Sequence, residues 1–213
     1  LAELEVNARA KVALLSSGDE LAEPGQARAS AGAIPESVSF GIAALVAAWG
    51  GTVVARRRLR DDLGTMRRAG LDALAQADLV VVTGGASVGE KDFAKEMFEP
   101  AGLELIFSKV AIKPGKPVWL GRARDRLVLG LPGNPTSALV TGRLLLAPLL
   151  AGLTGRDPGE ALRWRRVPLT CVAPAVADRE TFVRARRNGD GAELITNQDS
   201  GAQRALAAAD LLV

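Results

Sequence analysis

Short apolar runs alternate with helical patterns over the first two thirds of the chain. The runs at 12–15, 52–55 and 79–82 are largely apolar, as strands buried on both faces of a parallel sheet tend to be. The predicted helices cover 37–49, 63–76, 92–99 and 135–153, and the later predicted strands cover 103–110, 118–120 and 126–129. Strands that alternate with helices predict a three-layer α/β structure, in which a mostly parallel sheet has helices on both faces.

The pattern changes after residue 155. Gly, Pro and charged residues at 155–159 are typical of a linker. Beyond it lie strand-like runs at 167–172, 181–186 and 192–196, followed by an Ala-rich helix at 203–209. We therefore predict three parts, with residues 1–10 as a linker or the remnant of an N-terminal region, an α/β domain at 11–155, and a small β-rich domain at 160–213.

Composition narrows the chemistry that the chain can perform. Its 213 residues include no His, no Tyr and one Cys. The lack of His excludes His-based catalytic triads and His-ligated metal sites, and a single Cys excludes a disulfide framework. The sequence around Cys171 is apolar and rich in Val, so we expect this residue in the core. Carboxylates, Lys, Arg, hydroxyls and backbone amides remain for any chemistry.

Charge and hydropathy argue against nucleic-acid and membrane partners. Lys plus Arg number 27 and Asp plus Glu 24, so the net charge is only +3, and aromatic residues make up 4%. So few aromatics offer no platform for stacking bases, and the Arg clusters at 56–58 and 163–166 are interpreted as solvated surface. The longest apolar stretch, 138–153, is interrupted by Arg143 and Pro148 and falls short of the ~18 apolar residues of a membrane helix. No signal peptide is visible, so we expect a cytoplasmic location.

A Gly-rich loop follows the third predicted strand. Gly84 and Gly89 have the outer spacing of a phosphate-binding P-loop, and the backbone amides of such a loop can approach an anion closely. Glu90 and Lys91 stand where a P-loop continues with Gly-Lys-Ser/Thr, so a nucleoside triphosphatase is not expected. The alternative interpretation is a tight turn with Asp92 as a helix cap.

Two further loops carry candidate binding residues. Lys109, Lys113 and Lys116 lie within eight residues of one another in a segment stiffened by two prolines, and Lys side chains suit phosphate or oxyanion ligands. A solvated loop is the alternative. Residues 132–135 (Pro-Gly-Asn-Pro) form a rigid entry to the last long helix, where we expect the amide and hydroxyl of Ser137 to face outward. A loop that only starts a helix does not need two prolines around a Gly-Asn pair, so this segment is interpreted as a ligand-binding loop.

Acidic residues follow two of the predicted strands. Either Asp61 or Asp62 can cap the helix at 63–76. Asp61 and Asp92 both lie at strand-to-helix turns on the same expected sheet edge, so they can converge on one hard cation. Carboxylates beside a pyrophosphate suit Mg²⁺.

Four segments, in this order, resemble the molybdopterin molybdotransferase family, which includes MoeA and the gephyrin E domain. They are LSSGDEL at 15–21, GGASVG at 84–89, IKPGKP at 112–117 and LPGNP at 131–135. The resemblance covers roughly residues 5–213. It implies insertion of molybdenum from molybdate into adenylylated molybdopterin, with release of AMP, a requirement for magnesium, and a homodimer.

The resemblance also implies roles for individual residues. Asp61, Asp92, Lys109 and Lys113 correspond to catalytic positions, with Asp61 and Asp92 as the magnesium ligands. The positions expected to hold molybdate are Lys113, Lys116, Ser137 and Arg184. The positions expected to bind the pterin and its phosphates are Ser16, Gly18, Asp19, Gly84, Gly85, Ser87, Gly89, Pro132, Gly133, Asn134 and Pro135. The dithiolene sulfurs of the substrate are the nucleophiles, so no protein nucleophile is required.

The sequence departs from the family pattern at some positions. Pro-Glu-Ser-Val at 35–38 stands where the family has Tyr-Asp-Ser-Asn, and Arg204 and Ala205 stand where it has a Ser pair. Family members also carry an N-terminal half that adds acidic residues to the site, so this chain is expected to be a fragment or a form reduced to its binding half. The alternatives are therefore a non-catalytic molybdopterin-binding module and a scaffold that binds partner peptides. A nucleotide hydrolase is disfavoured by the incomplete P-loop.

Overall fold

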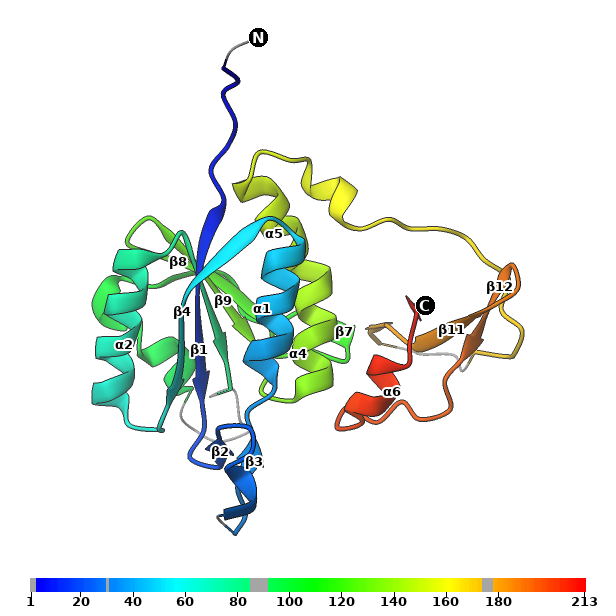
Figure 1. Ribbon diagram of the computed structural model, residues 1–213, viewed down its shortest axis with the longest axis horizontal. Coiled ribbons are helices and arrows are strands. Elements are labelled where there is room, and N and C mark those ends of the chain that lie inside the picture. Colours follow the sequence, from blue (N-terminus) through cyan, green and yellow to red (C-terminus); the bar gives the residue numbers. More distant parts are fainter. Residues whose placement is uncertain (1–2, 30, 85–91, 174–177) are drawn as a thin grey trace.

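A six-stranded sheet forms the centre of the structure (Figure 1). The computed structural model describes residues 3–29, 31–84, 92–173 and 178–213. The sheet strands are β1 (Ala10–Ser17), β4 (Gly51–Leu59), β5 (Leu79–Thr83), β6 (Glu104–Phe107), β8 (Trp119–Ala123) and β9 (Arg126–Leu131). They lie in the order β4-β1-β5-β9-β8-β6, and β8 runs antiparallel to both its neighbours while β4, β1, β5 and β9 are parallel. The predicted mostly parallel sheet is confirmed.

Helices cover both faces of this sheet (Figure 1). On one face lie α2 (Leu63–Gln76) and α3 (Phe93–Glu96), and on the other lie α1 (Val38–Ala48), α4 (Pro135–Thr141) and α5 (Ala147–Leu153). The predicted three layers are therefore confirmed. Short 3-10 helices occupy Ala27–Ala29, Glu99–Ala101 and Pro158–Ala161, and the two-residue strands β2 (Leu21–Ala22) and β3 (Ile34–Pro35) pair with each other in the loop after β1.

The last long helix is continuous, as predicted, but a π-helical segment at Gly142–Leu146 joins α4 to α5. By length and hydropathy alone the stretch Pro135–Leu153 could cross a membrane, despite Arg143 and Pro148. Its most apolar window is 61% buried inside the protein, however. This burial is what the core helix of a folded domain shows.

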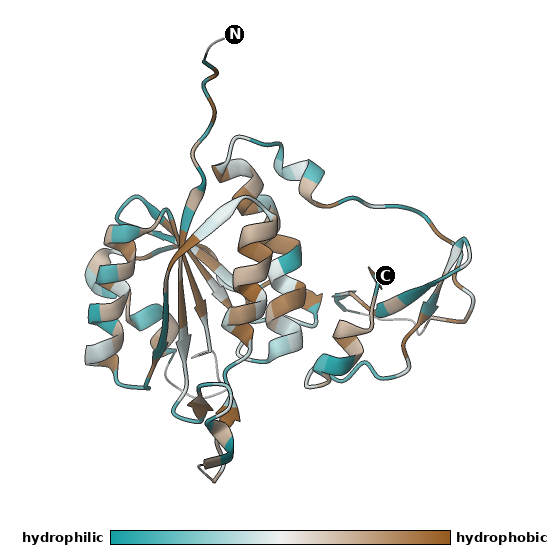
Figure 2. Ribbon diagram, in the orientation of Figure 1, coloured by the Kyte–Doolittle hydropathy of each residue, from teal (hydrophilic) through white to brown (hydrophobic). Residues whose placement is uncertain are grey.

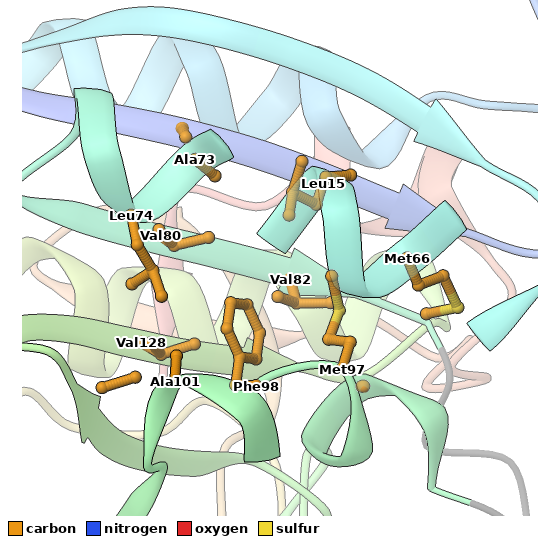
Figure 3. Close-up of a cluster of buried hydrophobic side chains, with 14 of the residues drawn as sticks. Leu15, Met66, Ala73, Leu74, Val80, Val82, Met97, Phe98, Ala101 and Val128 are labelled. Atoms are coloured by element: carbon orange, nitrogen blue, oxygen red, sulfur yellow. The ribbon is translucent and has the colours of Figure 1, made fainter. Parts of the chain in front are cut away.

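Alternate residues of the strands contribute to two apolar clusters, one on each face of the sheet. In β1, Ala13 and Leu15 belong to one cluster, and Val12 and Leu14 belong to the other. Figure 3 shows the first cluster, which includes Met66, Ala73, Leu74, Val80, Val82, Met97, Phe98, Ala101 and Val128. Figure 2 shows the hydrophobic residues concentrated along the central strands. Burial of each large apolar side chain stabilises the folded state by about 1.5–3 kcal/mol. The strands therefore hold the loops at their ends in defined positions.

The C-terminal part is a small antiparallel sheet in the order β12-β11-β13. Its strands are β11 (Arg184–Asn188), β12 (Gly191–Leu194) and β13 (Leu211–Leu212), and α6 (Gln203–Ala207) precedes the last of them. A two-residue parallel pair, β7 (Ile112–Lys113) with β10 (Glu180–Thr181), connects this part to the α/β part. The predicted β-rich character is confirmed, while the domain boundaries at 155 and 160 stay a prediction.

The predicted strand at 167–172 is wrong. Leu169 forms an isolated bridge with Ala192, and the third strand of the small sheet comes from the C-terminal residues of β13 instead. The described backbone hydrogen bonds of this segment to the small sheet are confined to Ala192, which accepts from the Thr170 amide at 3.0 Å and donates to the Pro168 carbonyl oxygen at 2.9 Å. Pro168 has no amide hydrogen to extend the ladder, and Val172 is 95% exposed. Cys171 is consequently exposed, which corrects the expectation that it lies in the core.

Two other predicted elements are shorter than expected. The strand expected at 103–110 is confined to β6, because the chain then turns and Val110 donates its amide to the Lys116 carbonyl oxygen at 3.2 Å. The helix expected from Asp92 to Glu99 contains only the four residues of α3, and a 3-10 turn with Pro100 follows it. In both places a local turn replaces the last part of the element.

Candidate functional site

A cavity of about 590 Å³ lies at the carboxyl ends of β1, β5 and β9, and we call it the strand-end cavity. This edge is where open α/β sheets usually bind their ligands. The predicted site residues that line it are Gly18, Asp61, Gly84, Gly133, Asn134 and Pro135. The structure thus brings together residues from four loops, after β1, β4, β5 and β9, that are far apart in the sequence.

Glycines allow the loops around the strand-end cavity to approach one another closely. Gly84 has a φ of +88°, and a Cβ atom there would overlap the carbonyl oxygen of Ser17. A Cβ atom on Gly133 would lie 3.2 Å from the Gly84 Cα atom. The loops after β1, β5 and β9 therefore pack backbone against backbone where they line the cavity.

Three other predicted pterin-binding residues lie beside or beneath this cavity. Ser16 and Thr83 are buried, and the Thr83 hydroxyl donates to Ser16 Oγ at 3.1 Å, which ties β1 to β5. Pro132 is also buried, whereas Asp19 is exposed at the rim. Gly85, Ser87 and Gly89, the remaining predicted pterin ligands, lie outside the described residues.

The two neighbouring carboxylates Asp61 and Asp62 have different surroundings. Asp62 caps α2, where its Oδ1 accepts a hydrogen bond from the Thr65 amide at 2.7 Å. The Thr65 side chain, and after it the Thr65 amide, lower the pKa of Asp62 by hydrogen bonding to its carboxylate. Asp61 lines the strand-end cavity, and its pKa is raised by partial burial and by the negative charges of Asp19 and Glu20. Asp62 is therefore the helix cap, and Asp61 is the carboxylate directed to the cavity.

The structure does not gather Asp92 among the residues that line the strand-end cavity, although its neighbour Phe93 is one of them. Asp92 Oδ2 forms an ion pair with Lys95 Nζ at 2.6 Å, and Asp92 Oδ1 is buried without a hydrogen-bond partner in the described part of the chain. Over the same part, no group of three or more His, Cys, Asp or Glu residues could hold a metal ion. The convergence of Asp61 and Asp92 on one cation stays a prediction.

A second cavity, of about 760 Å³, lies between the α/β part and the small sheet, and we call it the cationic cavity. It brings together Lys113, Lys116, Ser137 and Arg184, the four residues predicted to hold molybdate. Arg179 adds a fourth cationic side chain, which sequence reasoning missed because a single Arg carries no motif. Lys109, by contrast, is exposed and is not among the residues that line this cavity.

The guanidinium of Arg184 is held in place from the small sheet. Arg184 is 3% exposed, and it donates from Nε to Gln198 Oε1 at 3.2 Å and from Nη1 to the Asp199 carbonyl oxygen at 3.0 Å. Its burial lowers its pKa, while the charge of Asp199 acts in the opposite direction. Because the other nitrogen positions are not all engaged by these bonds, Arg184 can still donate to an anion.

The first turn of α4 separates the two cavities. Asn134 and Pro135 line the strand-end cavity, and Thr136 and Ser137 line the cationic cavity. Asn134 Oδ1 accepts from the Ser137 amide at 3.4 Å, so that amide does not face outward as expected. Asn134 Nδ2 also donates to Ser200 Oγ at 3.3 Å, and Ser200 lines the cationic cavity. One asparagine thus caps the helix and links the two parts of the protein.

Residues 35–38, where the sequence departs from the family pattern, line another side of the strand-end cavity. Glu36 is buried and accepts hydrogen bonds from the amide and the hydroxyl of Ser39, and Arg56 Nη1 lies 3.5 Å from Glu36 Oε2. Glu36 therefore stabilises the start of α1. The sequence shows that Glu36 departs from the family pattern. It does not predict that Arg56 lies beside Glu36, because this contact depends on the placement of β4.

Comparison with known proteins gives a consistent family. The family described as "Probable molybdopterin binding domain" matches residues 13–152. The chain is 40% identical to "Molybdopterin molybdenumtransferase" of Haemophilus influenzae over 168 residues. This aligned region covers 79% of this chain and 40% of that protein. The chain is 31% identical to "Molybdenum cofactor synthesis protein cinnamon" of Drosophila melanogaster over 208 residues. This aligned region covers 95% of this chain and 34% of that protein.

A solved structure leads to the same family. The molybdopterin biosynthesis MoeA protein of Pyrococcus horikoshii superposes with a TM-score of 0.78 at 30% identity, over 96% of this chain and 49% of that one. The chain therefore spans less than half the length of these relatives.

Proposed function

Because the chain belongs to the molybdopterin-binding domain family of molybdenum cofactor biosynthesis, we propose that it binds adenylylated molybdopterin and molybdate for molybdenum insertion. AMP is released in this reaction. The observation that carries the proposal is the pair of adjoining cavities on the two sides of the first turn of α4. One is built to accept phosphates, and the other is built to accept an oxyanion.

The strand-end cavity suits the phosphates of the pterin substrate. Closely packed glycine backbones at its base leave room for a charged group to approach peptide amides, and the helix that starts at Pro135 directs its positive end there. Gly18, Gly133 and Asn134 complete this surface. We place the diphosphate in this cavity, with the pterin toward its rim.

The cationic cavity suits molybdate. Lys113, Lys116 and Arg184 supply positive charge, and the Ser137 hydroxyl supplies a donor beside them. Charge-assisted hydrogen bonds of this kind are roughly twice as strong as neutral ones. The same cations stabilise the negative charge of the oxyanion as the dithiolene sulfurs displace its oxygens, so Lys113 serves in binding and in catalysis.

The carboxylates at the rim of the strand-end cavity fit a magnesium ion. Asp61 provides hard oxygen ligands, and the negative charges of Asp19 and Glu20 that raise its pKa also attract a cation. Few protein ligands are expected, because Mg²⁺ usually keeps several waters and shares substrate phosphates. When bound, magnesium neutralises charge on the phosphates as AMP leaves. Asp61 is the proposed protein ligand, with Asp92 as a second one.

Chromatographic measurement of AMP release tests the proposal. We expect the chain, given adenylylated molybdopterin, magnesium and molybdate, to release AMP. Lys116→Gln should lower the rate about tenfold or more and leave pterin affinity nearly unchanged, because it removes one charge from the cationic cavity only. Lys11→Gln, on an exposed Lys at the opposite end of β1, is the matched control and should keep the wild-type rate.

Two results would contradict this proposal. Equal loss of AMP release in Lys116→Gln and Lys11→Gln would mean that the cationic cavity has no specific part in the reaction. Tight pterin binding without any AMP release would instead support the alternative of a non-catalytic molybdopterin-binding module.

A further inference from the structure

The single cysteine of the chain lies on the wall of the cationic cavity. Cys171 is exposed and lines this cavity together with Lys113, Lys116, Arg179 and Arg184. The proposed insertion reaction assigns no role to this thiol. Cys171 lies two residues after Leu169, which forms an isolated bridge with Ala192.

The lining of the cavity is predominantly cationic, although the exposed Asp178, which is not one of its lining residues, pairs through Oδ1 with Arg179 Nε at 3.5 Å. Of the described residues that line it, four are Lys or Arg and none is Asp or Glu. A cleft lined by one sign of charge raises the local concentration of ligands of the opposite sign, and raises their association rates by ~10-fold or more at low ionic strength. Any anionic reagent that reaches Cys171 is therefore drawn in by the surrounding cations.

Thr136 indicates independently that this cavity receives a ligand. Thr136 lines the cavity and is 1% exposed, and its hydroxyl has no hydrogen-bond partner within the described ranges. A buried hydroxyl without a partner is costly, and an oxygen of a bound ligand would satisfy it. The thiol of Cys171 thus shares its cavity with a donor that lacks an acceptor.

We propose that Cys171 is a modification site at which the cationic cavity directs reaction with anionic disulfides of the glutathione disulfide class. The Cys171 thiol loses its proton to solvent, and the thiolate attacks one sulfur of the disulfide. The disulfide S–S bond breaks, a new S–S bond to Cys171 forms, and the other half leaves as a thiolate with the electron pair. The attached anionic group then occupies the cationic cavity.

Modification at this position blocks the cavity reversibly. An adduct held among Lys116, Arg179 and Arg184 excludes an oxyanion from the same cations, and a small thiol restores the free cysteine by the reverse exchange. The inference rests on the proposed function only where it identifies that oxyanion as molybdate. The reaction of the thiol itself requires only the cavity described above.

Reaction rates with two disulfides of different charge test the proposal. The probes are 5,5′-dithiobis(2-nitrobenzoate), a dianion, and 4,4′-dithiodipyridine, which is neutral, each normalised to its rate with a neutral model thiol. We expect Cys171 to prefer the dianion about tenfold at low salt, and the preference to shrink as NaCl shortens the screening length. Peptide mass spectrometry identifies Cys171 as the modified residue.

Two variants separate the cavity from the general surface charge. Arg179→Gln removes a cation from the cavity wall and should lower the normalised dianion rate several-fold without changing the neutral rate. Arg187→Gln removes the same charge from an exposed position of β11 outside the cavity and should leave both rates unchanged. Thermal melting shows that each variant is folded, and the salt dependence of the wild type gives the same information without any variant.

Equal normalised rates for the two disulfides, or equal effects of Arg179→Gln and Arg187→Gln, would overturn the proposal. Added molybdate should slow the dianion reaction. If charge selectivity is present but molybdate gives no protection, the thiol site stands and the placement of molybdate fails. If molybdate protects without charge selectivity, the placement of molybdate stands and the directed modification fails.

Discussion

Asp61 and Asp62 are adjacent in the sequence, yet the fold moves their pKa values in opposite directions. The Thr65 side chain and amide stabilise the charged form of Asp62, whereas partial burial and the nearby Asp19 and Glu20 destabilise the charged form of Asp61. The sequence predicts that one of the two caps a helix. It does not predict the raised pKa of Asp61, because Asp19 and Glu20 lie about forty residues earlier in the chain.

Asp61→Asn should stabilise the protein at neutral pH and not at low pH. The pKa of Asp61 is raised in the folded state, so its contribution to stability is fully present below the ordinary value of 3.8 and is lost as pH rises through the raised value. We expect the variant to melt about 1–2 °C above wild type at pH 7, and the two to converge near pH 3.5. Asp62→Asn should instead lower the melting temperature at pH 7. A higher melting temperature at pH 7 for both variants would mean that the gain in Asp61→Asn does not come from the raised pKa of Asp61.

The sequence predicts which residues come together where a motif contains them, and does not do so where only a distant neighbour determines their surroundings. Lys113, Lys116, Ser137 and Arg184 were predicted as one set, and they line one cavity. Cys171 was expected in the core from the Val residues around it. Val172, directly after it, is 95% exposed, and the described residues before it pair with the small sheet only through the bridge at Leu169.

At the scale of elements, the glycines after the strands determine how close the loops can come. Gly84 ends the described segment after β5 and lies against the backbone of Ser17, at the end of β1, with Gly133 on its other side. The sequence predicted these loops from strand–glycine–helix order. The contact between them follows from the register of β1 with β5 and of β5 with β9, which no local pattern contains.

Gly84→Ala should be much more destabilising than Gly25→Ala. Both glycines have a φ of +88°, but a Cβ atom at Gly84 overlaps the Ser17 carbonyl oxygen and at Gly25 meets nothing within 4 Å. Gly25→Ala should therefore cost about 1–2 kcal/mol for the backbone conformation alone. Gly84→Ala should cost about 1–3 kcal/mol more for the overlap. Urea denaturation checks this, and similar losses in both variants would mean that the loops are not closely packed.

The long elements were predicted well and the short ones less well, for a physical reason. Buried parallel strands such as β1 and β5 carry continuous apolar runs, and α2 carries a capping residue and an apolar repeat. In the small sheet, β13 has only two residues, and its pairing with β11 is set by tertiary contact. A strand of two residues is too short to show the alternation of apolar and polar positions from which strands are predicted.

At the scale of the whole molecule, the arrangement of two cavities around the first turn of α4 explains why four separated segments share one family pattern. Residues of the segment at 15–21 and Gly84 line the strand-end cavity, the segment at 112–117 lines the cationic cavity, and 131–135 leads into the helix turn between them. The C-terminal part completes the second cavity with Arg179, just before β10, and Arg184, in β11. The resemblance predicted this grouping of residues, but the separation into two cavities appears only in the structure.

The most direct test of the proposed function is a titration of the 213-residue chain with adenylylated molybdopterin in the presence of magnesium, followed by pterin fluorescence. Binding to the strand-end cavity predicts saturation at one site per chain, with affinity lost in Gly84→Ala and kept in Gly25→Ala. A signal that does not saturate, or that saturates equally in both variants, would contradict the assignment of the pterin to this cavity.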